Sequence, residues 1–221
     1  ISPQNSGIII EYVDHGSLAG GTLEKLLEHT ETPLNYDQQW RLSFELASGL
    51  EAIHAWDIIH GDLKPENILV YGHANTERTQ LDWHLKISDF GLAQKVGEKK
   101  KTGSLLWRAP ELFSHGGANS KKTDIYATAL IFWSIHSRIE PFLEFTNEFQ
   151  FRQAMRKGVT HPDGTITFPI RPPIDDSMIP NQPKFARLIR SCWEEKPEDR
   201  PESAAVILQE LEAIKPQELT K

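Results

Sequence analysis

Hydrophobic positions follow a helical period along most of the chain. Between Asp37 and Trp56 apolar residues recur at steps of three and four, which predicts a long amphipathic helix. The same reasoning predicts helices over 22–29, with Thr22 as its cap, and over 123–137, 147–157, 183–193 and 203–214. The helix over 123–137 contains "ATALIFWSI", which is apolar on all sides and about half as long as a bilayer span. We therefore expect this helix to be buried in the core.

Short β-branched runs predict a few strands between the helices. "GIIIEYV" (7–13), "NILVY" (67–71) and "LKIS" (85–88) have this character. The polar segment 72–84 between the last two is too long for a tight hairpin turn, so we interpret it as a surface insertion. Proline-rich connections such as "FPIRPPI" separate the later helices. The pattern predicts one α+β domain that is mainly α-helical and carries short β hairpins.

Composition narrows the class of protein. The chain has 221 residues, of which 38% are hydrophobic and 25% charged, as expected of a single folded unit. Its net charge of -7 argues against general affinity for nucleic acids, and no apolar run is long enough for a membrane span. Cys192 is the single cysteine, so no internal disulfide can form, which favours a cytoplasmic location. The start, "ISPQNSGIII", has no initiator methionine and no signal-peptide pattern, from which we expect a fragment.

Candidate chemistry lies in "IIHGDLKPENILV" (58–70), a polar loop between two aliphatic runs. Asp62 is placed to act as a general base or to orient a hydroxyl, and Lys64 to neutralise a transferring anion. Asn67 offers an amide oxygen to a hard cation such as Mg²⁺. Asp89 follows a predicted strand in "ISDFG", from which its carboxylate can share that cation with Asn67. Together these roles describe phosphoryl transfer.

Five motifs occur in one order along the chain: "HGDLKPEN" (60–67), "DFG" (89–91), "GSLLWRAPE" (103–111), "TDIYATAL" (123–130) and "CWEEKPEDRP" (192–201). In this order they resemble the C-terminal lobe of a eukaryotic-type protein kinase, over about residues 8–211. The closing motif is most similar to those of tyrosine-kinase-like and tyrosine kinases, whereas Lys64 is the serine/threonine-type residue. The resemblance implies a protein kinase C-lobe with short hairpins at the catalytic cleft, and phosphorylation of protein serine or threonine.

The resemblance implies a role for each matching residue. Asp62 would accept or orient the substrate hydroxyl, Lys64 would contact the γ-phosphate of ATP, and Asn67 and Asp89 would hold Mg²⁺. Ser104 matches the hydroxyl residue that links the catalytic aspartate and lysine. Supporting roles fall to a packed histidine, to the aspartate that braces the catalytic loop, and to a buried ion pair. These residues are His60, Asp124, Glu111 and Arg200.

The same resemblance places the adenine site at the start of the chain. Ile10 would be the gatekeeper, and the backbones of Glu11 and Val13 would bind adenine. Leu69 would form the floor beneath the base, and Ser17 lies where a ribose contact is expected, although "LAGG" (18–21) lengthens this loop. Residues 1–13 would then be the last strand of the small lobe and the hinge, and residues 14–221 the C-lobe. A protein substrate, ATP and regulatory proteins are the implied partners.

Two departures from the family pattern stand out. No glycine-rich loop and no "VAIK"-type lysine precede Gly7, so most of the small lobe is missing from these residues. We expect residues 1–221 alone to bind ATP weakly and to show little activity. Gly61 stands where many protein kinases have an arginine that binds a phosphorylated activation loop, so that regulatory contact is expected to be absent.

Other interpretations compete with an active protein kinase. A pseudokinase would keep the fold as a scaffold for other proteins. Aminoglycoside and choline kinases share the "HGDL" pattern with Gly61, but usually lack Lys64, the "DFG" glycine, "APE" and the closing motif. Taken singly, each polar loop is equally compatible with solvated turn residues. The lysines from Lys95 to Lys101 indicate a solvated loop that could also attract an acidic peptide.

Overall fold

The computed structural model describes residues 20–28, 34–74, 81–98, 103–174 and 183–216. The α-helices within these residues are α1 (Leu23–Glu28), α2 (Tyr36–Ala55), α3 (Lys121–Ser137), α4 (Glu148–Lys157), α5 (Pro183–Cys192) and α6 (Ala204–Ala213). The strands are β1 (Gly20–Thr22), β2 (Ile58–Ile59), β3 (Ile68–Ala74), β4 (Leu81–Ile87), β5 (Gln94–Lys95), β6 (Val159–Thr160) and β7 (Ile166–Thr167). Short 3-10 turns lie at η1 (Pro65–Asn67), η2 (Phe90–Leu92), η3 (Leu105–Trp107), η4 (Pro110–Phe113) and η5 (Pro197–Asp199).

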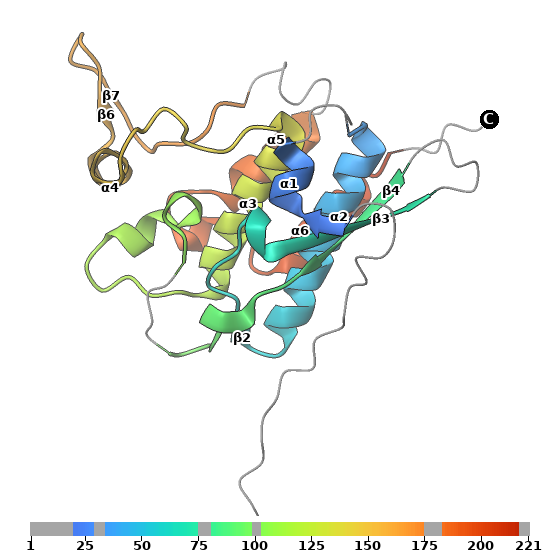
Figure 1. Ribbon diagram of the computed structural model, residues 1–221. Helices are drawn as coiled ribbons and strands as arrows, with labels where there is room; N and C mark the ends of the chain where they lie inside the picture. The colour runs from blue at the N-terminus through green and yellow to red at the C-terminus, as the bar shows by residue number, and fades with distance from the viewer. Residues whose placement is uncertain (1–19, 29–33, 75–80, 99–102, 175–182, 217–221) are drawn as a thin grey trace, which may run out of the picture.

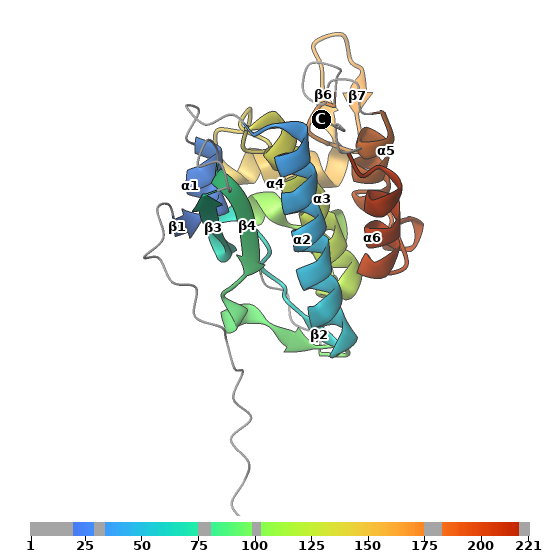
Figure 2. The same cartoon turned by 90° about the vertical axis from the view of Figure 1, so that its right-hand side faces the viewer.

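Helix α3 forms the centre of the core, as its sequence predicts. Every residue from Thr123 to His136 is buried, and the helix packs against α2 and α5. Figure 2 shows α2 and α6 side by side, with α3 behind α2. Ser120 caps α3, because its hydroxyl accepts a hydrogen bond from the Thr123 N–H while the Thr123 hydroxyl oxygen accepts one from the Ser120 N–H. The helix therefore begins at Lys121, two residues before its predicted start.

Helix α2 begins where a second capping box forms. The Asn35 side chain accepts a hydrogen bond from the Gln38 N–H at 2.9 Å, and the Gln38 side chain accepts one from the Asn35 N–H at 3.1 Å. The buried Trp40 donates its indole N–H to the Leu211 carbonyl at 2.8 Å, which joins α2 to α6. The amphipathic pattern of 37–56 thus predicts the helix, and of its apolar stripe Trp40, Ala47 and Leu50 are buried.

The hairpin of β3 and β4 is longer than the sequence predicts. Its antiparallel register runs from Ile68 opposite Ile87 to Ala74 opposite Leu81, so both strands extend into the segment interpreted as an insertion. Glu45 of α2 accounts for part of this extension. It accepts a hydrogen bond from the Leu85 N–H at 2.7 Å and contacts His84 Nδ1 at 2.6 Å. On the other edge β3 pairs with β1, so Gly20 and Gly21 form a strand where the sequence predicts only loop.

Several smaller elements complete the fold. Strand β2, which directly precedes the loop over 60–67, pairs with β5, so that Lys95 lies in a strand. Thr22 caps α1 as predicted, since its hydroxyl accepts a hydrogen bond from the Lys25 N–H at 3.4 Å. The β6–β7 hairpin extends away from the helical core (Figure 1). Helices with short antiparallel strands confirm the α+β, mainly α-helical class. In the described segments, no helix has both the length and the apolar character that crossing a bilayer requires.

Candidate functional site

The catalytic-loop region runs from β2 through η1 to β3, and Asp124 fixes its start. This aspartate is only 2% exposed. Its Oδ2 accepts a hydrogen bond from the His60 N–H at 2.8 Å, and its Oδ1 accepts one from the Gly61 N–H at 2.9 Å. His54 Nε2 lies 3.0 Å from the same Oδ2. The central helix α3 thereby holds the backbone immediately before Asp62 in place.

The Asp62 carboxylate is held by one donor on each oxygen. Its Oδ1 accepts a hydrogen bond from the Ser104 backbone N–H at 2.6 Å, and its Oδ2 accepts one from the Asn67 side-chain amide at 3.1 Å. The same Asn67 amide also donates to the Asp62 carbonyl at 2.8 Å. One donor from the same loop, Asn67, and one from a distant segment, Ser104, therefore fix the orientation of this carboxylate, as a positioned base requires.

Asn67 directly precedes β3 and Asp89 lies two residues after β4, so both are at the same end of the β3–β4 hairpin. The Ser88 N–H donates to the Asn67 carbonyl at 2.9 Å, which places Asp89 one residue beyond that contact. Because the Asn67 amide nitrogen serves Asp62, its oxygen is left for a cation. Asp89 is exposed and adopts a left-handed conformation with φ 59°, with its Oδ1 accepting from the Gly91 N–H at 3.1 Å. An amide oxygen and a carboxylate at this corner fit Mg²⁺, which prefers oxygen ligands.

Lys64 and Ser104 lie at this site with contacts other than those the family pattern implies. Lys64 Nζ lies 3.5 Å from Glu66 Oε1, the ion pair that the structure shows for this lysine. Ser104 reaches Asp62 through its backbone N–H, and the described hydrogen bonds contain none from its hydroxyl to Lys64. The predicted link between Asp62 and Lys64 through the Ser104 hydroxyl is therefore not among the described contacts.

Gly61 lacks the arginine side chain found in many protein kinases, and its backbone also adopts a conformation that favours glycine. Its φ is +75°, a conformation that L side chains rarely adopt. Gly103, with φ +101°, approaches it from residues 103–111, which match the end of the family's activation segment and are given that name here. A Cβ added to Gly103 would lie 2.6 Å from the Gly61 carbonyl oxygen. The missing side chain of Gly103 therefore lets the activation segment come close enough for Ser104 to reach Asp62.

Glu111 and Arg200 form the buried ion pair. Arg200 Nη1 and Nη2 donate to the two carboxylate oxygens of Glu111, each at 2.8 Å, and the Arg200 side chain is fully buried. The guanidinium also donates to the carbonyls of Lys122 and Glu194 and lies over the Tyr126 ring. This pair joins the end of the activation segment to the C-terminal helices without reaching the reacting groups.

The structure describes only some of the remaining predicted site residues. His60 is buried, with its ring nitrogen Nε2 3.0 Å from the Ser88 carbonyl and its ring against Phe90. Leu69 lies half-buried in β3. The predicted strand over 7–13 lies outside the described residues. So do four predicted adenine-site residues, Ile10, Glu11, Val13 and Ser17.

Sequence reasoning missed residues that the fold brings to the site from a distance. His54 contacts Asp124 from the last turn of α2, where its polarity gave no functional signal. Arg108 donates to the Gly103 carbonyl, and burial together with the positive charge of Arg152 lowers the pKa of its guanidinium. Asn119 is buried and its amide lies 3.5 Å from the Gly61 carbonyl. These positions become recognisable only once the loops are folded together.

Comparison with known proteins agrees with this geometry. The family model described as "Protein kinase domain" matches residues 2–211. Receptor-interacting serine/threonine-protein kinase 2 of Bos taurus is 30% identical over 226 residues, covering 96% of this chain and 38% of the relative. Receptor-interacting serine/threonine-protein kinase 1 of Homo sapiens is 30% identical over 213 residues, covering 88% of this chain and 28% of the relative.

A probable serine/threonine-protein kinase of Dictyostelium discoideum is 28% identical over 207 residues, covering 93% of this chain and 13% of the relative. The chain thus spans well under half the length of each of these relatives. Their similarity concerns one domain, and the remainder of each relative has no counterpart in these 221 residues.

Proposed function

The chain belongs to the protein kinase domain family, and on that basis we propose that it transfers the γ-phosphate of ATP to serine or threonine side chains of proteins. Serine/threonine kinases among its relatives support this choice of acceptor. The observation that carries the proposal is the Asp62 carboxylate, which Ser104 and Asn67 hold by one oxygen each. The confirmed likeness to protein kinases also favours this activity over phosphorylation of aminoglycosides or choline.

In this mechanism Asp62 orients the acceptor hydroxyl and takes its proton. The hydroxyl oxygen bonds to the γ-phosphorus as the bond from that phosphorus to the bridging oxygen breaks, and ADP leaves. A positioned general base contributes roughly a hundredfold to ten-thousandfold to such a step. Lys64 carries a positive charge on the same loop and is assigned to the γ-phosphate, which requires it to leave Glu66 when ATP binds.

We assign Mg²⁺ to Asn67 and Asp89, whose oxygens suit that cation. When bound, the ion neutralises negative charge on the phosphates. Leu69 is assigned to the floor of the adenine site, and Ile10, Glu11, Val13 and Ser17 to its hinge side and ribose contact. The proposed division of the chain follows from these assignments, with residues 1–13 as strand and hinge and residues 14–221 as C-lobe.

The 221 residues by themselves are expected to bind ATP weakly. Their sequence contains neither a glycine-rich phosphate loop nor a "VAIK"-type lysine, which in the family cover and grip the phosphates. The competing interpretation of the same motifs is a pseudokinase, which would bind regulatory proteins through this fold without transferring phosphate. Titration of 1–221 with a fluorescent ATP analogue tests the first expectation, and micromolar affinity would contradict it.

A transfer assay on the protein expressed from its complete coding sequence tests the proposed function. With Mg²⁺ and γ-labelled ATP, label should appear in a generic protein substrate, and acid hydrolysis should release phosphoserine or phosphothreonine. The Asp62→Ala variant should lose this labelling, whereas Asp199→Ala, an exposed carboxylate far along the chain, should retain it. Label in choline or kanamycin with none in protein would support a small-molecule kinase, and no label in any acceptor would support the scaffold.

A further inference from the structure

One peptide unit of the activation segment is held at both of its ends. Its N–H, which belongs to Ser104, donates to Asp62 Oδ1 at 2.6 Å, and its carbonyl, which belongs to Gly103, accepts a hydrogen bond from Arg108 Nη2. The unit is planar and trans, so its N–H and its carbonyl point in opposite directions. A donor that holds the carbonyl on one side therefore also sets the direction of the N–H on the other.

Without such a donor this peptide unit would turn over easily. Gly103 has no side chain, and its φ of +101° lies in a region that glycine visits freely. Turning the unit over would point the Ser104 N–H away from Asp62 and bring the Gly103 carbonyl oxygen toward the carboxylate, which repels it. The hydrogen bond from Arg108 opposes this movement.

Arg108 is well placed to hold the Gly103 carbonyl. It directly follows η3, and its own backbone N–H donates to the Leu105 carbonyl at 3.3 Å, so the chain turns back on itself at this point. The side chain can then reach a carbonyl five residues earlier. The same small cavity of about 20 Å³ is lined by Gly61, Asp62, Gly103, Ser104 and Arg108. Arg108 therefore lies beside the proposed base.

Arg108 is the donor that the structure shows for this carbonyl within the described residues. The neighbouring part of the catalytic loop is Gly61, which has no side chain and approaches Gly103 with its carbonyl oxygen, a group that cannot donate. Asn119 directs its amide to the Gly61 carbonyl at 3.5 Å. Removing the Arg108 guanidinium should therefore leave the Gly103 carbonyl without a side chain that holds it.

Stability alone does not explain a charged side chain at position 108. The guanidinium is half-buried, its Nε is buried without a hydrogen-bond partner, and no ion pair includes it in the part of the chain that the structure describes. Burial lowers the pKa of Arg108, and the positive charge of Arg152 lowers it further, against the opposing charges of Asp62 and Glu148. Burying a charge without a counter-charge is unfavourable. An apolar side chain would favour folding more, so the hydrogen bond to Gly103 is what the arginine adds.

We propose that Arg108 is a positioning residue for phosphate transfer, which keeps the peptide unit between Gly103 and Ser104 turned with its N–H on the Asp62 carboxylate. This inference rests on the proposed function and adds a residue that acts through Asp62. A hydrogen bond to the carbonyl also polarises the peptide unit and strengthens its N–H as a donor. The carboxylate is thereby kept in one orientation toward the accepting hydroxyl. Misplacing a reacting group by about 1 Å costs about a hundredfold in rate.

Hydrogen exchange of the Ser104 amide in the 221-residue chain tests the positioning without phosphate transfer. By NMR, this amide should be protected in the original protein. Arg108→Met, which keeps an unbranched side chain and removes its donors, should speed the exchange by about tenfold or more. Arg108→Lys can still donate to the Gly103 carbonyl, so its rate should lie between the two. Asp62→Ala removes the acceptor and marks the rate of this amide without its hydrogen bond.

Matched measurements separate this local effect from charge and from stability. Arg187→Met removes the same charge from an exposed position on α5 and should leave Ser104 exchange unchanged. The amide of Leu130, in the buried helix α3, reports global unfolding and should exchange at the same rate in all the arginine variants. Arg108→Met should also unfold at no lower urea concentration than the original protein, because it loses a half-buried charge that has no ion pair.

Steady-state kinetics of the protein from the complete coding sequence measure the consequence for transfer. Arg108→Met should lower kcat by about tenfold to a hundredfold. The KM for ATP should not change, because Arg108 is not assigned to ATP. Arg108→Lys should have a kcat between those of Arg108→Met and the original protein, and Arg187→Met should keep the original kcat.

An unchanged rate of Ser104 exchange in Arg108→Met would overturn the inference. So would equal acceleration at Ser104 and Leu130, because Arg108 would then act only through global stability. Faster Ser104 exchange with an unchanged kcat would also overturn it and leave the kinase activity intact. If the original protein transfers no phosphate, the proposed function fails, whereas the hold of Arg108 on Ser104 is still decided by the exchange rates.

Discussion

Asp124 accepts a hydrogen bond from the backbone N–H of His60 at 2.8 Å, which ties the central helix to the catalytic loop. The same carboxylate accepts from Gly61 at 2.9 Å and contacts His54 at 3.0 Å, and the side chains of Asp124, His54 and His60 are buried. The fold thus determines where Asp62 stands through a residue that has no role in the proposed chemistry.

Replacing Asp124 should therefore destabilise the whole domain. Asp124→Ala leaves two backbone N–H groups without their partner, and we expect the free energy of unfolding to fall by about 3 to 5 kcal/mol. Urea denaturation measures this change. The exposed Asp199→Ala should shift it by less than about 0.5 kcal/mol, and an equally small effect at Asp124 would contradict the bracing role.

We predict that substitutions of Glu111 and Arg200 have strongly non-additive effects on the free energy of unfolding. Glu111→Ala leaves the fully buried Arg200 without its counter-charge, so we expect a loss of about 3 to 5 kcal/mol of stability. In Glu111→Ala/Arg200→Met no lone charge remains, and the loss should be smaller than the sum of the two single losses. A double-mutant cycle by chemical denaturation gives the coupling. Additive losses would show that the pair does not stabilise the fold.

Gly103 and Gly97 form a matched pair for testing the close approach to Gly61. Both have left-handed φ values, +101° and +98°, but a Cβ on Gly97 meets nothing within 4 Å whereas one on Gly103 meets the Gly61 carbonyl. Gly97→Ala should cost about 1 kcal/mol from backbone strain alone. Gly103→Ala should cost about 3 kcal/mol and reduce transfer activity, because Ser104 moves away from Asp62. Equal effects of the two substitutions would exclude the steric argument.

Because His136 is buried, we expect the domain to lose stability in mild acid. Burial lowers its pKa from 6.5 to about 3, and its ring packs 4.1 Å from that of Phe185. Above pH 6.5 the imidazole is neutral in both states and has no effect. As the pH falls below 6.5 only the unfolded state gains this proton. The free energy of unfolding therefore falls by about 2 kcal/mol between pH 7 and pH 5.

Urea unfolding at the two pH values measures this dependence. Other groups contribute to the slope, so His136→Leu, which cannot titrate, serves as the reference. The original protein should lose about 2 kcal/mol more than this variant on going from pH 7 to pH 5. Parallel pH profiles would contradict the assignment of the effect to His136.

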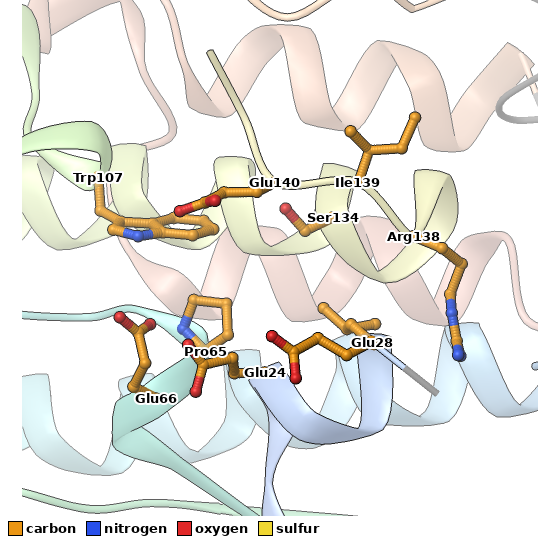
Figure 3. Close-up of a pocket in the computed structure, with 10 residues that line it drawn as sticks. Glu24, Glu28, Pro65, Glu66, Trp107, Ser134, Arg138, Ile139 and Glu140 are labelled. Atoms are coloured by element: carbon orange, nitrogen blue, oxygen red, sulfur yellow. The ribbon is translucent and has the colours of Figure 1, made fainter. Parts of the chain in front are cut away.

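The features that could be predicted from sequence are those encoded in contiguous residues. The all-apolar run of α3 predicts its burial, and the adjacent letters of "HGDLKPEN" bring Asp62 and Asn67 together within one turn. The full length of β3 and β4 could not be predicted, because Glu45 supports that hairpin from about 40 residues away. The cavity between α1, η1 and the end of α3 (Figure 3) was likewise hidden, since Glu24, Glu66 and Glu140 in its wall belong to three separate segments.

Two local expectations were also incomplete for a physical reason. Ser104 suggests a hydroxyl contact by its residue type, but its backbone N–H makes the bond to Asp62. Gly61 suggests only a lost side chain, yet its φ of +75° shows that the loop also uses the conformational freedom of glycine. A residue's type in a motif therefore predicts its place better than the atom through which it acts.

The single-turnover rate of phosphate transfer tests the central claim most directly. It is measured with the protein from the complete coding sequence, saturating Mg²⁺-ATP and a serine peptide, comparing the original protein with Asp62→Asn. We predict a rate lower by roughly a hundredfold to ten-thousandfold in the variant, with ATP affinity unchanged because Asp62 is not assigned to ATP. An unchanged rate, or no transfer by the original protein, would contradict Asp62 as the base of a protein kinase.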